Sequence, residues 1–269
     1  MLLSNCAPTL LANPFELNVS ALDQALAATR NAGFDAVGLW SFHLQFGGDA
    51  VAAAVADAGL SVVTIDAALA WVEGPSAAAA EEMDGLIAVA DQFGAPVIHA
   101  TTLGPVNDLE AAKDGYAAIA AQAEAAGKVL GLEFLPWTGI PTLAAANEIA
   151  AHGGPAAGIL LDTWHWFRQP GGPDLELLRS IPGERITSVQ LSDAPPAASA
   201  DLATEAMTSR LLPGAGIIDF SAVWDALEHS GATPVVAAEV LSDSLKAEGP
   251  EAMARAVHDA SRRVLPPVK

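Results

Sequence analysis

Short apolar runs alternate eight times with alanine-rich amphipathic stretches along this chain, and this alternation limits its fold more than any other feature. Several runs are apolar at nearly every position, which is typical of parallel strands covered by helices. The eight expected strands are Leu3–Thr9, Ala36–Trp40, Ser61–Ala67, Pro96–Thr101, Val129–Leu135, Gly158–Thr163, Ile186–Leu191 and Pro234–Leu241. Helices are expected between them, among others at Ala21–Asn31, Ala77–Phe93, Leu109–Ala126 and Phe220–Ser230.

Eight strands that alternate with eight helices form the repeat of a closed (β/α)8 TIM barrel, an α/β fold, and 269 residues suit its usual length of about 250. An open, doubly wound sheet is the alternative. No G-x-G-x-x-G follows the first expected strand, which weighs against the dinucleotide-binding form of that sheet. Since no linker, charge block or low-complexity tract divides the chain, we expect residues 1–269 to form a single domain.

The chain carries 32 acidic and 12 basic side chains, which gives a formal net charge of −20. Such acidity argues against nucleic acid and anionic membrane surfaces as partners, because both attract lysine and arginine side chains. No uncharged apolar stretch reaches the roughly 18 residues of a membrane span, and the single cysteine, Cys6, requires no oxidising compartment. We therefore expect a cytoplasmic enzyme with a small-molecule substrate, and self-association into a homo-oligomer stays open.

Polar side chains stand near the ends of the last four expected strands, where apolar ones would suit the core. They are Glu133, Asp162, Gln190 and Glu239. The C-terminal ends of barrel strands meet at one mouth, so these side chains would converge there. An uncompensated buried carboxylate is very costly, which means that each of these groups pairs with an arginine, caps a helix or binds a cation. Because the twelve basic residues mostly fall in helical stretches, one divalent metal is the economical interpretation. Oxygen ligands favour Mn²⁺ or Mg²⁺ over zinc.

The same residues lie in motifs that follow one another along nearly the whole chain. These are Leu132-Glu133-Phe134, Leu161-Asp162-Thr163-Trp164-His165, Val189-Gln190-Leu191-Ser192-Asp193, Arg210-Leu211-Leu212-Pro213-Gly214-Ala215-Gly216 and Ala238-Glu239-Val240. In this order they resemble the xylose isomerase-like sugar phosphate isomerase/epimerase family, whose members are TIM barrels.

The resemblance implies that four residues hold the metal, namely Glu133, Asp162, Gln190 and Glu239. It also implies that His165 and Arg210 contact substrate oxygens. Many members carry histidine at the position of Gln190, although glutamine occurs in some, including bacterial 3-dehydroshikimate dehydratases of this family. Gln190 therefore leaves the metal preference and the exact reaction open.

A metal-chelated carbonyl acidifies the proton on the neighbouring carbon, and Glu133 and Glu239 are the expected acid/base pair that moves this proton. Its return to the neighbouring carbon gives isomerisation, and its return to the opposite face gives epimerisation; an isomerase or epimerase is the preferred function. Expulsion of a β-hydroxyl would instead make the protein a lyase that dehydrates a keto sugar, an inosose or a 3-dehydroshikimate-like compound. His165 would polarise a carbonyl or donate to the leaving hydroxyl. An abasic-site endonuclease, which the charge of −20 opposes, and a non-catalytic barrel are further alternatives.

The expected mouth offers few basic side chains and the sequence has no P-loop, so an unphosphorylated polyol, keto sugar or cyclic keto acid is the expected substrate. Trp40 and Trp137 fall near expected strand ends and would line its apolar wall. His99 is interpreted as a satisfied core histidine. The stretch from Ser192 to Ile218 is long and irregular, and we expect it to close over the substrate and to bring Arg210 to it.

Overall fold

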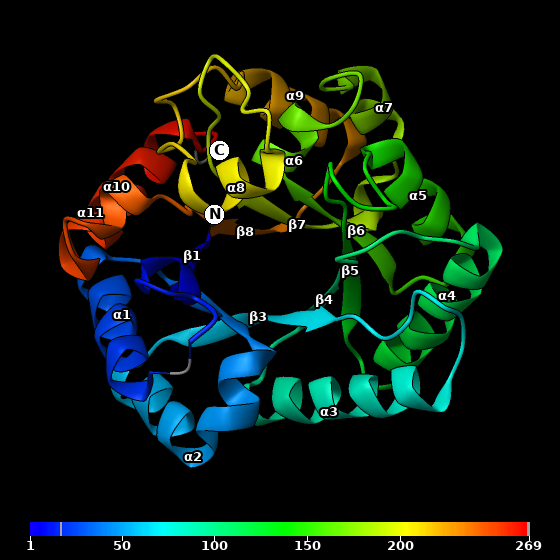
Figure 1. Cartoon of the computed structure of the whole chain (residues 1–269), viewed down its shortest axis with the longest axis horizontal. Helices are drawn as coiled ribbons and strands as arrows, with labels where there is room; N and C mark the ends of the chain where they lie inside the picture. Colours follow the sequence, from blue (N-terminus) through cyan, green and yellow to red (C-terminus); the bar gives the residue numbers. More distant parts are fainter. Residues whose placement is uncertain (17, 268–269) are drawn as a thin grey trace.

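A computed structural model describes residues 1–16 and 18–267, and in it eight parallel strands close into one barrel. Each strand pairs with its neighbours in sequence, and β1 pairs with β8 to complete the ring (Figure 1). The strands are β1 (Leu3–Cys6), β2 (Ala36–Trp40), β3 (Ser61–Ala68), β4 (Val97–Ala100), β5 (Val129–Glu133), β6 (Ala157–Asp162), β7 (Ile186–Leu191) and β8 (Val235–Ala238). The predicted TIM barrel is confirmed.

A ring of helices surrounds the strands (Figure 1). The α-helices are α1 (Val19–Ala32), α2 (Ser41–Ala58), α3 (Ala77–Phe93), α4 (Leu109–Ala125), α5 (Leu143–His152), α6 (Thr163–Arg168), α7 (Leu175–Ser180), α8 (Leu202–Thr208), α9 (Phe220–Ser230), α10 (Asp243–Lys246) and α11 (Pro250–Val264). Short 3-10 helices span Ala7–Leu10 and Gly183–Arg185. The segments after β6, β7 and β8 each hold two α-helices, so the expected repeat of one helix for each strand is not kept there.

The main core lies between the barrel and this ring. Helix side chains spaced three or four residues apart face the strands, as Leu22 and Leu26 of α1 and Met83 and Leu86 of α3 do, and all four are buried. Within the described residues, no helix combines the length and the apolar character needed to cross a lipid bilayer.

Several elements have the bounds that the sequence predicts, namely β2, β7, α3 and α9. The first strand is shorter than predicted, because Ala7–Leu10 forms a 3-10 helix that has Pro8 near its start. Proline has no backbone N–H to donate to a neighbouring strand. The last strand is also shorter and ends at Ala238, so that Glu239 is the first residue beyond it.

The connection between β7 and α9 is more regular than the sequence predicts. The stretch from Ser192 to Ile218 contains α8, and two β-bridges pair Asp193 with Leu211 and Ser209 with Ser242. In the view of Figure 1, α8 lies closer to the centre of the ring than α9 does. The expectation of an irregular segment is therefore wrong for Leu202–Thr208, whereas most of the remaining stretch lies outside helices and strands.

A buried carboxylate holds the remainder of this connection. Asp193 accepts hydrogen bonds from the backbone N–H groups of Gly214 and Gly216, each at 2.9 Å, and of Ile218 at 3.0 Å. A Cβ atom at Gly216 would lie 2.5 Å from Asp193 Oδ1, so the close approach needs glycine. Asp193 thus orients the backbone amides of this connection.

Candidate active site

The ends of β5 to β8 bring the four predicted metal ligands together at the mouth of the barrel. Glu133 is the last residue of β5, Asp162 is the last residue of β6, Gln190 lies in β7, and Glu239 follows β8. Asp162 and Gln190 are partners in the β6–β7 register, and Gln190 Nε2 donates to Glu239 Oε1 at 3.2 Å. Glu133, Gln190 and Glu239 line a pocket of about 370 Å³. The convergence that the sequence predicts is present.

Asp162 is fully buried, and both of its carboxylate oxygens accept hydrogen bonds. Oδ1 accepts from the backbone N–H of Trp164 at 2.7 Å and from that of His165 at 3.0 Å, which makes Asp162 the N-cap of α6. Oδ2 accepts from Arg210 Nη1 at 2.5 Å. The helix cap and the buried arginine, which the sequence offers as alternatives to a metal, are thus both present at this residue.

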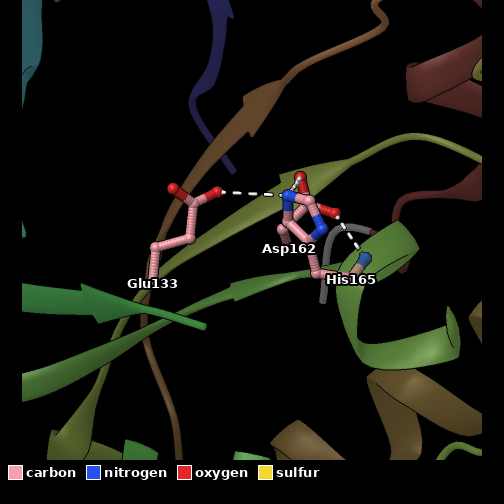
Figure 2. A group of neighbouring side chains, drawn as sticks. All are labelled: Glu133, Asp162 and His165. Atoms are coloured by element: carbon pink, nitrogen blue, oxygen red, sulfur yellow. Dashed lines mark hydrogen bonds and ion pairs between the residues drawn. The ribbon is translucent and has the colours of Figure 1, made fainter. Parts of the chain in front are cut away.

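The capped helix places His165 against two of the acids. Figure 2 shows Glu133 and Asp162 facing the imidazole, and His165 Nε2 lies 3.5 Å from Glu133 Oε1. One ligand atom of each of these three residues lies within 4.8 Å of the others, so the group could hold a metal ion. His165 is not among the ligands that the sequence predicts, and its participation would add a nitrogen to the oxygen donors.

Arg210 is buried inside the protein and does not lie on an exposed loop above the pocket. Its side chain is 2% exposed, and Nε donates to the backbone oxygen of Ala206 in α8 at 2.7 Å. Besides its contact with Asp162, Nη1 lies 3.4 Å from Glu239 Oε2. The guanidinium lines the pocket but is already ion-paired with two of the predicted ligands, which the sequence did not predict.

Burial and mutual repulsion change the protonation of the acids. Burial, followed by the charges of Glu239 and Asp162, raises the pKa of Glu133 well above its ordinary value of 4.5. Burial also raises the pKa of Glu239 to about 7, although the Arg210 guanidinium opposes this shift. Burial would raise the pKa of Asp162 too, but the charge of Arg210 and the hydrogen bonds from the His165 backbone N–H and from Arg210 outweigh it, and this pKa is lowered from 3.8. The metal-free site thus has one firmly ionised carboxylate and two that retain protons more readily.

The imidazole of His165 is neutral. Burial lowers the pKa of His165 to about 3, and the positive charge of Arg210 acts in the same direction. Arg210 Nη2 lies 3.2 Å from His165 Nε2, and since a guanidinium can only donate, we assign the proton of the ring to Nδ1. That Nδ1 atom is buried and has no hydrogen-bond partner in the described part of the chain.

The donor set fits a divalent cation. Gln190 Oε1 is buried, and no described residue donates a hydrogen bond to it. A buried amide oxygen normally has a partner. Together with carboxylate oxygens of Glu133, Asp162 and Glu239, it forms a group of hard oxygen donors of the kind that Mn²⁺ and Mg²⁺ prefer. A bound cation would also offset the repulsion that raises the pKa values of the two glutamates.

The pocket has a charged floor and an apolar wall. The four side chains that the sequence predicts as substrate contacts all line it, namely Trp40, Trp137, His165 and Arg210. Trp137 packs against His165 with ring centroids 5.3 Å apart. Further apolar lining residues are Phe15, Phe42, Leu69, Leu103, Leu135, Met207 and Leu241.

Sequence reasoning missed Asp66, which lines the same pocket from near the end of β3. A signal was available, because Asp66 is a carboxylate near the end of an expected strand, as Glu133 is. His99 of β4 is buried and contacts Asp66 through Nδ1 and Ser188 through Nε2. The interpretation of His99 as a satisfied core histidine is therefore confirmed, although its partner Asp66 belongs to the pocket.

Proteins of known structure or activity resemble this chain. A 3-dehydroshikimate dehydratase of Pseudomonas putida is 31% identical over 93 residues, which make up 35% of this chain and only 14% of that protein. The crystal structure of an IolI protein with a bound zinc atom has a TM-score of 0.79 at 20% identity, and the match covers 98% of both chains. The D-allulose 3-epimerase of Methylomonas sp. in complex with D-allulose has a TM-score of 0.75 at 14% identity, with 98% of this chain and 97% of that chain covered.

The two structural matches concern the fold, because so few residues are identical. The sequence profile of one family covers much more of the chain than the dehydratase does, and it matches residues 26–264. These residues run from within α1 to the last residue of α11 and include all of the predicted metal ligands and substrate contacts. The protein therefore belongs to the xylose isomerase-like TIM barrel family.

Proposed function

We propose that this protein is a divalent-metal-dependent isomerase or epimerase that moves a proton at a carbon next to the carbonyl group of a small sugar, polyol or keto compound. The observation that carries the proposal is the meeting of oxygen donors from the ends of four consecutive strands at the barrel mouth. Three of these residues, Glu133, Gln190 and Glu239, line one pocket, and Gln190 Oε1 has no protein donor among the described residues. Membership of a family that includes sugar epimerases supports it.

The proposed ligands of the metal are the four that the sequence predicts, namely Glu133, Asp162, Gln190 and Glu239. Oxygen donors favour Mn²⁺ or Mg²⁺, while the zinc atom of the IolI protein shows that this fold can also carry Zn²⁺. When bound, such a cation supplies a Lewis acid that polarises a substrate carbonyl and makes the neighbouring C–H more acidic.

Glu133 and Glu239 are the proposed acid/base pair. They reach the pocket from β5 and from the end of β8, with the two intervening strands between them, so they can address different faces of one substrate carbon. Their raised pKa values show that this environment favours the protonated carboxyl. A carboxyl with a pKa of about 7, as in Glu239, can both accept and return a proton. His165 and Arg210 would contact substrate oxygens, and Trp40 and Trp137 would exclude water from the reacting carbon.

A lyase that dehydrates a keto sugar, an inosose or a 3-dehydroshikimate-like compound is the second candidate. A specific observation favours it, because 93 residues of this chain are 31% identical to part of a 3-dehydroshikimate dehydratase. In this reaction one of the two glutamates would remove the carbon-bound proton and the other, in its protonated form, would give a proton to the departing β-hydroxyl, so that water leaves. His165 would contact this hydroxyl through a hydrogen bond.

Incubation in D₂O distinguishes these candidates. Mn²⁺-loaded protein is incubated with ketohexoses, inososes and 3-dehydroshikimate, and the compounds are recovered, freed of Mn²⁺ and examined by NMR. An isomerase or epimerase incorporates deuterium at the reacting carbon, whereas a lyase releases water and forms a conjugated product that absorbs in the ultraviolet. Glu133→Gln should abolish either reaction. The matched control is Glu73→Gln, which removes an exposed carboxylate from the segment that follows β3. Neither exchange nor water loss from any compound, with metal bound, would contradict both candidates.

A further inference from the structure

Three polar side chains from different strands form a hydrogen-bonded row beside the pocket. Asp66 Oδ1 of β3 contacts His99 Nδ1 of β4, and His99 Nε2 lies 2.8 Å from Ser188 Oγ of β7. His99 and Ser188 are 2% exposed, whereas Asp66 is 13% exposed and lines the pocket. The carboxylate is therefore the end of this row that a ligand can reach.

The His99 side chain crosses the interior of the barrel to reach Ser188. β4 and β7 are not neighbours, so the imidazole has to extend across the interior of the barrel. Its register partner on β5 is Gly131, and a Cβ atom there would lie 3.1 Å from His99 Cδ2 and 2.5 Å from Thr187 Oγ1. Glycine at this position leaves the space that the imidazole occupies.

The same three residue types form the triad of serine hydrolases, but here the order relative to the pocket is reversed. In a hydrolase the serine faces the substrate and the aspartate is buried behind the histidine. In this protein the serine lies at the buried end of the row, and the aspartate lines the pocket. A role for Ser188 as a nucleophile does not fit this placement, whereas direct contact between Asp66 and a ligand does.

Asp66 has one carboxylate oxygen that the protein does not satisfy. His99 occupies Oδ1, while Oδ2 is buried and has no hydrogen-bond partner among the described residues. Leaving a buried acceptor without a donor is unfavourable. A donor on a molecule bound in the pocket would remove this cost.

The charges around Asp66 indicate what kind of donor this is. Glu133 and Glu239 line the same pocket, and the Arg210 guanidinium is already bonded to Asp162 and Glu239. The carboxylates of this site outnumber its positive charges even if a divalent cation is added. A phosphate or carboxylate group on a ligand would be repelled beside Asp66, whereas a hydroxyl group would donate to it.

We propose that Asp66 is a substrate-binding residue whose Oδ2 accepts a hydrogen bond from a hydroxyl group, that His99 and Ser188 position it, and that the substrate is an uncharged polyhydroxy carbonyl compound. The proposal rests on the proposed function for the role of the pocket and adds the class of its substrate. Neutral keto sugars and cyclic keto polyols belong to this class, whereas phosphate esters and keto acids do not.

Binding measurements test this without relying on turnover. Mg²⁺-loaded protein, which gives sharp NMR signals, is titrated with D-fructose, myo-inositol and D-fructose 6-phosphate under ligand-observed NMR. Wild-type protein should bind at least one of the uncharged probes and should bind the phosphate ester more weakly than D-fructose. Asp66→Asn, which preserves the shape of the side chain, should weaken binding of the uncharged probe by about tenfold or more, the value expected for one hydrogen bond to a charged group. Ser188→Ala should weaken it severalfold, and Glu73→Gln should leave it unchanged.

Deoxy derivatives of the bound probe separate a direct contact from a structural effect. For the derivative that lacks the hydroxyl bound by Asp66, wild-type protein and Asp66→Asn should bind equally well. A purely structural role of Asp66 would weaken the binding of every derivative alike. Melting temperature and Mg²⁺ content, measured for each variant, show whether it is folded and loaded.

Four results would overturn the proposal: no binding of the uncharged probes to wild-type protein, unchanged binding to Asp66→Asn, equal weakening for all deoxy derivatives, or tighter binding of the phosphate ester. These outcomes are separable from failure of the proposed function. Binding that depends on Asp66 without any reaction in D₂O would refute the proposed enzyme but leave this inference intact. Exchange or water loss that is equal in wild-type protein and Asp66→Asn would support the proposed enzyme but refute this inference.

Discussion

Asp162 shows how a single side chain can combine a structural role with a proposed functional one. Its Oδ1 caps α6 and so fixes His165, while its Oδ2 is bonded to Arg210. The position of this residue could be predicted because a carboxylate at the end of an apolar strand is unusual. Its ion-pair partner Arg210 could not be predicted, because it is 48 residues away along the chain and the contact depends on how α8 packs.

Replacement of Arg210 tests the ion pair directly. In metal-free protein Arg210→Ala leaves the buried Asp162 carboxylate without its positive partner, and we expect the free energy of unfolding to fall by about 3–5 kcal/mol. Chemical denaturation measures this. The matched control is Arg262→Ala, which breaks a largely exposed pair with Asp35 and should cost about 1 kcal/mol or less. Equal effects of the two replacements would show that the Arg210 pair contributes little.

Gln190 is the proposed ligand that should most affect which metal is bound. Its amide oxygen is a hard donor, while the imidazole of a histidine suits Zn²⁺. Gln190→His should therefore retain one metal ion per chain and shift its preference from Mn²⁺ or Mg²⁺ toward Zn²⁺. Elemental analysis after loading from an equimolar mixture of the three metals measures the preference. An unchanged metal composition would argue that Gln190 is not a ligand.

Among the elements, the connection between β7 and α9 differs most from its prediction. The length of the connection is visible in the sequence, but α8 and the bridge between Asp193 and Leu211 are not, because they depend on contacts between residues far apart. Position 216 requires glycine because Asp193 approaches its backbone closely. Sequence patterns thus predicted the regular helices and strands better than this tertiary arrangement.

Loss of the Asp193 carboxylate should loosen this element. Asp193→Ala leaves the backbone N–H groups of Gly214, Gly216 and the buried Ile218 without their acceptor, and we expect the free energy of unfolding to fall by about 2–4 kcal/mol. Limited proteolysis should also cut between residues 192 and 218 more readily than in wild-type protein. The control Asp201→Ala, which removes the exposed N-cap of α8, should cost only about 1 kcal/mol. Unchanged cleavage in Asp193→Ala would contradict the role of the Asp193 carboxylate in holding residues 214–218.

At the scale of the whole molecule, the barrel was predictable because the alternation of strands and helices repeats through the chain. The same regularity predicted that residues at the ends of β5 to β8 would meet. The role of Asp66 could not be predicted as readily, because it depends on an imidazole that crosses the barrel where Gly131 leaves space. Properties that repeat along the sequence are visible in it, whereas contacts across the barrel are not.

The acids at the mouth should make the stability of the metal-free protein depend on pH. Since the pKa of Glu239 rises from 4.5 to about 7 on folding, the folded state holds more protons than the unfolded state between these values. The free energy of unfolding should therefore fall as pH rises through this range, by about 3 kcal/mol from Glu239 alone. Glu239→Gln should remove this part of the slope, while Glu73→Gln should keep it. A slope that is equal in all three proteins would contradict the raised pKa.

The carboxylates and the amide at the barrel mouth are proposed to hold one divalent cation, and metal analysis of the purified protein tests this most directly. Wild-type protein and Glu73→Ala are loaded with Mn²⁺, passed through a desalting column and analysed for protein and metal, alongside Glu239→Ala. We expect one Mn²⁺ per chain in wild-type protein and in Glu73→Ala, and a small fraction of that in Glu239→Ala. Equal, sub-stoichiometric metal in wild-type protein and Glu239→Ala would contradict the claim.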